Sequence, residues 1–117
     1  MDAAHLLDLA RRFPEVTLKD GSSWTSIRFR THGFAWVKHD DDLLMLKSTH
    51  DERAALVGSD PDTFSDGWSS ATTAWVTIRL DRIDADEVLE LVADAWRLKA
   101  PRKVIAAFES AHPDGLP

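Results

Sequence analysis

Residues 74–101 read AWVTIRLDRIDADEVLELVADAWRLKAP, and this stretch decides the fold class. Apolar residues recur at every second position from Val76 to Leu80, which is the period of a β-strand with one buried side. Asp84 and Glu87 then form a capping box, the sequence signature of a helix start. Apolar residues follow at helical spacing, at positions 88, 91, 92, 95 and 96. A strand and an amphipathic helix that each have one apolar side predict a sheet packed against helices.

Three short segments upstream predict an antiparallel meander. They are rich in β-forming residues, and the turn formers His32-Gly33 and Asp40-Asp41-Asp42 separate them. Their predicted bounds are residues 25–31, 34–39 and 43–47. These segments and the strand at residues 74–80 form one predicted antiparallel sheet.

Two helices are predicted on either side of the meander. Residues 2–13 carry apolar side chains at helical spacing, with Asp2 as the cap and Pro14 as the stop. Thr49, followed three residues later by Glu52, is a second capping-box pattern. It opens a short helix that the next glycine can end.

The rest of the chain is predicted to form a loop and a last helix. Residues 59–70 read as a loop because they hold an Asp-Pro and an Asp-Gly pair. Pro101 lacks an amide hydrogen and disfavours helical geometry at the preceding residue, so it ends one helix and starts another. The apolar stripe of the last helix, Val104, Ile105 and Phe108, either folds back on the body or docks on a neighbouring molecule. The order of elements predicts a two-layer α+β domain, an antiparallel sheet with helices packed on one face.

Length and composition predict one cytoplasmic domain. Of the 117 residues, 44% are hydrophobic and 29% are charged, which excludes both a disordered chain and a membrane protein. We expect a core at residues 2–108 and a flexible tail at residues 109–117. The absence of cysteine excludes a disulfide framework and thiolate chemistry. No segment resembles a secretory signal or approaches membrane-spanning length, which indicates an intracellular protein with no membrane partner.

A series of segments, in a fixed order over roughly residues 5–104, resembles the MmcQ/YjbR family. They are residues 13–16 (FPEV), 34–37 (FAWV), 43–47 (LLMLK), 51–53 (DER), 60–64 (DPDTF), 75–81 (WVTIRLD) and 94–101 (DAWRLKAP). The resemblance implies a single YjbR-like domain, similar to the secretion-chaperone-like and CyaY-like α+β folds. It also implies a DNA-binding role, because the family is commonly given that label for a proposed double-wing arrangement. The resemblance brings no catalytic residues with it.

Strand alternation predicts a basic and aromatic face on the sheet. In each predicted strand the apolar residues face the helices, and the lysines and arginines fall on the other side. The predicted nucleic-acid-binding residues are Arg28, Arg30, Trp36, Lys38, Lys47, Trp75 and Arg79, with Met45 beside them. The predicted core between sheet and helices consists of Ile27, Phe29, Leu44, Leu46, Val76, Ile78, Leu80, Leu91, Val92 and Trp96.

This face has three interpretations. Cations bind phosphates and aromatic rings stack on unpaired bases, so DNA is one candidate partner. Because the net charge of the chain is −6, DNA binding requires the cations to be gathered on one face. A half-exposed antiparallel sheet also alternates apolar and charged residues without any ligand. Exposed aromatic residues suit an interface with another protein or a second copy of the chain, with Trp36, Trp68 and Trp75 as anchors.

The sequence contains no signature of catalysis or of a cofactor. The glycines are isolated, so neither a P-loop nor a dinucleotide fingerprint is present, and no serine sits in a nucleophile elbow. His32, His39 and His50 lie near three consecutive aspartates, which raises a metal site as an alternative, but their spacing matches no established motif and favours a solvated turn. We therefore predict a non-enzymatic binding module with no catalytic residues, cofactor or metal.

Overall fold

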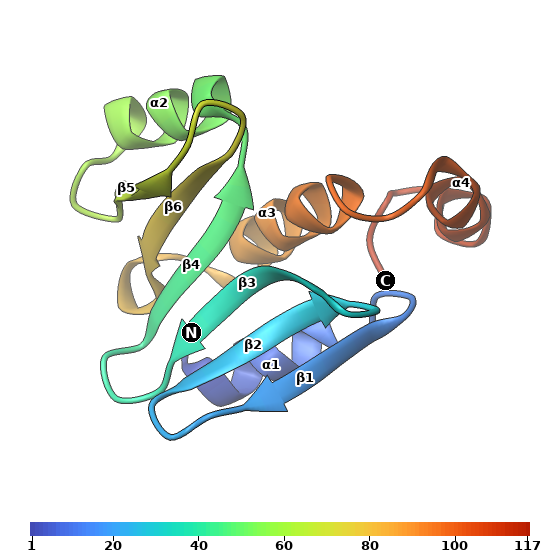
Figure 1. The fold of residues 1–117 in the computed structure, drawn as a ribbon, viewed down its shortest axis with the longest axis horizontal. Helices are drawn as coiled ribbons and strands as arrows, with labels where there is room; N and C mark the ends of the chain where they lie inside the picture. The colour runs from blue at the N-terminus through green and yellow to red at the C-terminus, as the bar shows by residue number, and fades with distance from the viewer.

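The chain folds into a six-stranded antiparallel sheet and four α-helices. The computed structural model describes all 117 residues and is drawn as a ribbon in Figure 1. The elements are α1 (Ala3–Ala10), β1 (Val16–Asp20), β2 (Trp24–Phe29), β3 (His32–Lys38), β4 (Leu43–Ser48), α2 (His50–Ser59), β5 (Phe64–Ser69), β6 (Ala74–Arg79), a short 3-10 helix (Leu80–Arg82), α3 (Ala85–Arg97) and α4 (Arg102–Ala111). The strand order is β1-β2-β3-β4-β6-β5, and all neighbours are antiparallel. The predicted α+β class is confirmed.

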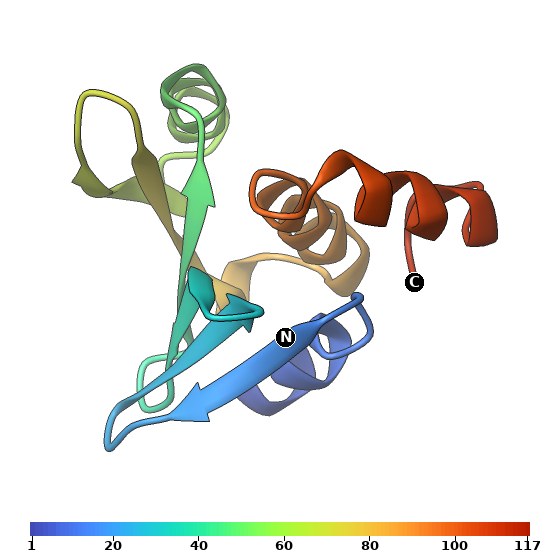
Figure 2. The ribbon, with the colours of Figure 1, turned by 45° about the vertical axis from the view of Figure 1, so that its right-hand side comes forward.

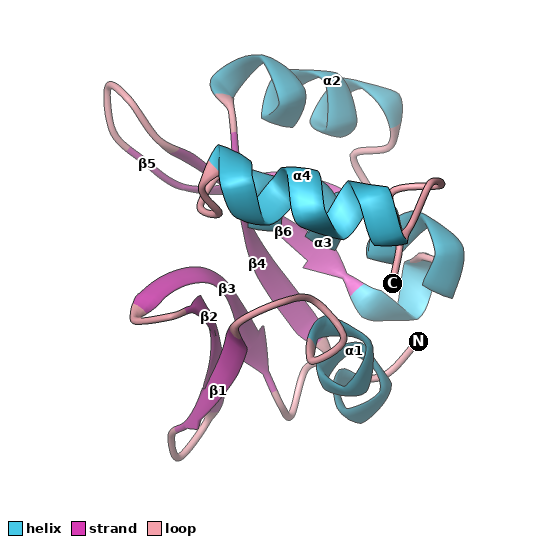
Figure 3. Ribbon diagram, turned by 90° about the vertical axis from the view of Figure 1, so that its right-hand side faces the viewer, coloured by secondary structure: helices cyan, strands magenta, loops and turns pink.

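The helices leave one side of the sheet open. In Figure 1, α1 lies behind β1 and β2 and α3 lies behind β4, whereas no helix lies in front of the strands. Figure 3 shows α2 and α1 at opposite ends of the helical layer, with α3 and α4 between them. The sheet is strongly twisted, since β1 and β2 run at a steep angle to β4 (Figure 2). None of the helices has the length and the hydrophobicity that crossing a membrane requires.

Trp96 of α3 is the centre of the core. Its side chain is fully buried, and its ring centroid lies 5.6 Å from that of Phe13, 6.3 Å from that of Phe29 and 5.1 Å from that of Phe108. The indole Nε1 donates a hydrogen bond to the Pro14 carbonyl over 3.1 Å. Trp96 therefore joins the end of α1, the sheet and α4 in one aromatic cluster.

The predicted core is buried in the structure, with one correction. Every predicted core residue is buried except Leu91, which is half-buried. The buried stripe of α3 includes Val88, Val92 and Trp96, and Leu91 lies at the edge of this stripe.

Pro101 separates α3 from α4, as predicted, and caps α4. Phe108 is buried in the aromatic cluster, while Val104 and Ile105 are half-buried. The apolar stripe of the last helix therefore folds back on its own chain. The flexible tail was expected from residue 109, but the helix continues to Ala111 because its stripe is anchored by Phe108.

Two edge strands, β1 and β5, were not predicted. β1 lies between the first predicted helix and the first predicted strand, and β5 lies inside the predicted loop at residues 59–70. Each of these strands has only one neighbouring strand, and its other edge faces solvent. Polar residues at such an edge do not destabilise the sheet. β5 also shifts register between Asp66 and Ser69, which accommodates its turn-forming residues.

Two boundaries differ from the prediction for local reasons. β2 ends at Phe29, and Arg30 turns the chain with a φ of 56°, so the turn precedes His32-Gly33 instead of containing it. α2 continues through Gly58, which does not adopt the left-handed conformation that ends a helix.

Two glycines are expected to respond in opposite directions when replaced by alanine. A Cβ at Gly67 would lie 2.8 Å from the Trp75 carbonyl oxygen, which the β5–β6 ladder holds in place, so Gly67→Ala should destabilise the fold by about 1–3 kcal/mol. A Cβ at Gly58 would meet nothing within 4 Å, so Gly58→Ala should stabilise α2 by about 0.5–1 kcal/mol. Urea unfolding of both variants tests this, and the same sign of change in both would contradict it.

Candidate functional site

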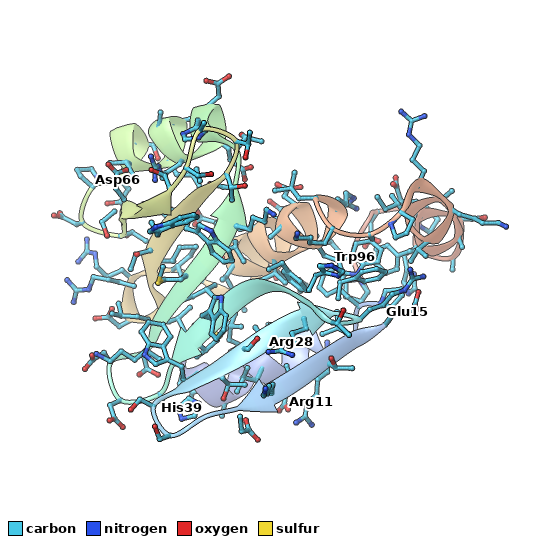
Figure 4. All side chains as sticks on the ribbon, in the orientation of Figure 1. Arg11, Glu15, Arg28, His39, Asp66 and Trp96 are labelled. Carbon is cyan, nitrogen blue, oxygen red and sulfur yellow. The ribbon has the colours of Figure 1, made fainter.

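The strand register places all predicted binding residues but one on the helix-free side of the sheet. Directly paired residues of antiparallel strands point to the same side, and here Trp36 pairs with Met45 and Lys47 pairs with Trp75. We call this side the open face. Its predicted members are Arg28, Trp36, Lys38, Lys47, Trp75 and Arg79, together with Met45. Figure 4 shows Arg28 on this side of β2.

Arg30 is the predicted binding residue that lies away from the open face. It occupies the turn after β2, where its guanidinium donates two hydrogen bonds to the Glu15 carboxylate, over 2.9 and 3.2 Å. Its guanidinium carbon also lies 4.9 Å from the centroid of the Phe29 ring. The hydrogen bonds from Arg30 lower the pKa of Glu15. Arg30 thus ties the β2–β3 turn to the segment that precedes β1.

Two cations of the open face carry their own counter-ions. Lys38 contacts Asp41 over 2.6 Å, and Arg79 contacts Asp81 over 3.1 Å. The hydrogen bond to Asp41 raises the pKa of Lys38, so this side chain stays protonated. Such exposed pairs add little stability, but they cancel the charge that a polyanion would meet. The open face is therefore not a continuous basic surface.

Trp24, Trp36 and Met45 line an apolar hollow on the open face, and we call these three residues the tryptophan platform. Trp36 is 38% exposed. A second hollow adjoins the first and is lined by both tryptophans, Lys19, Arg28 and the loop at residues 20–23. Lys19 and Arg28 form no ion pair, and the Arg28 Nε donates only to the Ser26 hydroxyl, over 3.1 Å. Two aromatic rings therefore stand beside two cations that have no carboxylate partner.

Two residues of this site were not predicted from the sequence. Trp24 has the same strand parity as Arg28, a signal that was available, but the predicted strand began at residue 25. Lys19 belongs to β1, which was not predicted at all. Trp75, which was predicted, is half-buried and does not belong to the platform. It pairs with Lys47, two residues beyond Met45 along β4.

The other end of the open face holds a pair of lysines. Lys47 lies near the end of β4, and Lys99, which follows the end of α3, is the nearby cation that acts on it. Burial of the Lys47 ammonium and, to a smaller extent, the nearby Lys99 ammonium together lower the pKa of Lys47 to about 8. The charged form of Lys47 is therefore less stable in the folded chain than in water.

The stability of the fold is expected to rise with pH between about 8 and 10, because of Lys47. In this range the unfolded chain, with a lysine pKa of about 10.4, holds a proton that the folded chain has released. Below pH 8 both states are protonated, and the cost of the charged Lys47 is fully present. Lys47→Met should raise the melting temperature at pH 7 and flatten this dependence, whereas Lys103→Met, at an exposed lysine, should not. If the melting temperatures of the wild type and Lys47→Met changed with pH in the same way, Lys47 would not be the cause of this pH dependence.

The histidines and aspartates do not form a metal site. No group of three or more His, Asp or Glu side chains is arranged to hold a metal ion. His39 lies at the end of β3 (Figure 4), where its Nε2 is 2.5 Å from the Thr25 hydroxyl oxygen. That hydroxyl donates to the Asp20 carboxylate over 3.0 Å, so the imidazole supplies the proton of the other bond. His50 lies elsewhere, against the Ser70 carbonyl.

Comparison with known proteins identifies the family. Two solved structures share the fold: the Deinococcus radiodurans protein DR2400, with a DUF419 domain, and a Pseudomonas syringae protein. The first has a TM-score of 0.75 at 18% identity and covers 99% of this chain and 89% of its own. The second has a TM-score of 0.64 at 14% identity and covers 86% of this chain and 100% of its own. These low identities show the fold alone.

No curated protein matches the chain significantly. The family model that matches is YjbR, over residues 11–98, and these residues include the sheet, α2 and α3. Because this match spans most of the chain, the protein belongs to the YjbR family.

Proposed function

We propose that the protein is a non-enzymatic binding module that takes single-stranded DNA on its open face. Trp24 and Trp36 would stack on bases, while Lys19 and Arg28 would contact phosphates. The hollow that these four residues share is the observation that most directly supports the proposal.

The tryptophan platform favours unpaired bases over a duplex. Stacking of a base on an aromatic ring contributes about 1–3 kcal/mol and requires a free base face, which a duplex hides. Trp24 pairs with Lys38 and Trp36 pairs with Ser26, so the two rings are diagonal neighbours on adjacent strands. Two bases of one strand can therefore use the platform together.

The electrostatic contribution is expected to be small. Only Lys19 and Arg28 stand beside the platform without a counter-ion, and the chain as a whole carries a net charge of −6. Each phosphate contact with a single strand changes the slope of log K against log salt by about −0.7, so two contacts predict a slope of about −1.4.

A fluorescence-anisotropy titration tests the proposal. Labelled oligo-dT and the matching duplex are titrated at several salt concentrations with the wild type, Arg28→Ala and Arg30→Ala. We expect the single strand to bind more tightly than the duplex. Arg28→Ala should weaken binding, and Arg30→Ala, the matched arginine away from the face, should not. Absence of binding at low salt, or a preference for the duplex, would overturn the proposal.

A protein interface is the second candidate function. Trp68 lies on the edge strand β5 and is 63% exposed, so it offers a large apolar side chain next to unpaired backbone groups. A second copy of the chain could pair along this edge. Sedimentation at high protein concentration tests this, because a dimer that Trp68→Ser dissociates would support it, and a strictly monomeric wild type would exclude the homodimer.

A further inference from the structure

Met45 places a sulfur atom in the tryptophan platform. It is half-buried, pairs with Trp36 on the neighbouring strand, and lines the apolar hollow together with Trp24 and Trp36. Met1, the only other methionine, packs against the hydrophobic core and lines none of the surface hollows. The chain has no cysteine, so no thiol competes for an oxidant. An oxidant that meets the open face of the folded chain therefore finds the Met45 thioether.

The Met45 side chain lies beside a ring that the strands hold in place. Directly paired residues of antiparallel strands have Cβ atoms about 4.5–5.5 Å apart, so Met45 is a direct neighbour of the Trp36 indole. A Cβ added at Gly33 would lie 3.7 Å from Cζ2 and 3.9 Å from Cε2 of Trp36. The indole thus lies against the Gly33 backbone and cannot move in that direction. A chemical change at Met45 therefore acts directly on the surface that Trp36 presents.

We propose that Met45 is a modification site, at which oxidation by a peroxide switches the platform from an apolar to a polar surface. In this reaction the thioether sulfur takes one oxygen atom from hydrogen peroxide. An S–O bond forms, the O–O bond breaks, the sulfur gives up two electrons, and the rest of the peroxide leaves as water. Methionine sulfoxide reductases restore the thioether, so the change is reversible.

The sulfoxide opposes stacking because its oxygen is a polar group that water solvates. All three side chains that line the hollow are apolar before oxidation, so a base covers them without displacing a bound polar group. After oxidation, a base that stacks on the platform removes water from the sulfoxide oxygen, and the lost hydrogen bonds weaken binding. This effect on DNA rests on the proposed function, whereas the oxidation of Met45 does not.

Peroxide treatment of the folded chain tests the modification site. Peptide mass spectrometry follows the gain of one oxygen atom at Met45, in native protein and in urea, and we expect similar rates in both. In the NMR spectrum of the oxidised protein, the indole N–H signals of Trp24 and Trp36 should shift. The signal of Trp96, which is buried in the core, should not.

The matched control is Met45→Leu, which keeps Met1 and replaces the thioether by an apolar side chain of similar volume. Peroxide should cause no shift of either platform signal in this variant. Oxidation of Met45 in urea alone, or oxidation in the native chain without a shift of either signal, would overturn the modification site.

A binding measurement tests the consequence for DNA. Oligo-dT is titrated with the wild type and with Met45→Leu, each before peroxide, after peroxide, and after subsequent treatment with methionine sulfoxide reductases. Oxidation should raise the Kd of the wild type by about fivefold or more, as expected for the burial of an unpaired polar group, and the reductases should reverse the rise. Peroxide should leave the Kd of Met45→Leu where it was.

The two parts of the experiment fail separately. If the indole signals shift but neither form of the wild type binds oligo-dT, the proposed function fails and the modification site stands. If the wild type binds oligo-dT with the same Kd before and after oxidation of Met45, the platform binds DNA but oxidation does not regulate it.

Discussion

Replacement of Trp96 by alanine is expected to lower the free energy of unfolding by about 3–5 kcal/mol. The side chain is completely buried and contacts three other aromatic rings. Its removal would leave a cavity where the sheet, the end of α1 and α4 meet, and would leave the Pro14 carbonyl without its hydrogen bond. A domain of this size has a total stability of about 5–15 kcal/mol, so the variant should melt far below the wild type.

The matched control for this substitution is Trp68→Ala. Trp68 is 63% exposed, and its removal should change the stability by about 0.5 kcal/mol or less. Urea unfolding followed by circular dichroism gives both values. Similar losses in Trp96→Ala and Trp68→Ala would mean that the aromatic cluster does not hold the fold together.

Removal of both rings of the platform, in a Trp24→Ala and Trp36→Ala double variant, is expected to have the largest effect on binding. Loss of two stacking contacts should weaken oligo-dT binding by about 2–6 kcal/mol, which is roughly a 30-fold or greater rise in Kd. Trp36 is 38% exposed and Trp24 is half-buried, so the fold should survive the change.

Two measurements make this result interpretable. Urea unfolding of the double variant shows whether the fold is retained, and Trp68→Ala shows what the loss of an exposed tryptophan away from the platform does to binding. Binding that persists in the double variant would place the DNA contact elsewhere on the molecule.

The helix starts were predictable because their signals are local. The Thr49 side chain accepts a hydrogen bond from the Glu52 amide over 3.1 Å, and the Asp84 side chain accepts one from the Glu87 amide over 2.8 Å, as the two capping boxes predict. Both contacts span three residues, so neighbouring positions in the sequence were enough to identify them.

The candidate site was predictable only in part. Alternation along each strand placed Trp36, Lys38 and Lys47 on the open face without knowledge of the register. It placed Arg30 there wrongly, because a turn with a positive φ ends the strand at Phe29, two residues before the predicted end. Trp24 was missed because the strand was predicted to begin one residue too late.

The sequence by itself determined the α+β class, the helix caps, the buried side of each central strand and the break at Pro101, because all of these depend on residues close together in the chain. Only the tertiary structure decided that β1 and β5 form edge strands and that burial and the nearby Lys99 lower the pKa of Lys47. It also decided that the open face retains few free charges. Edge strands gain their hydrogen bonds from a neighbouring strand, and charges interact through space, so both depend on distances that local sequence patterns do not contain.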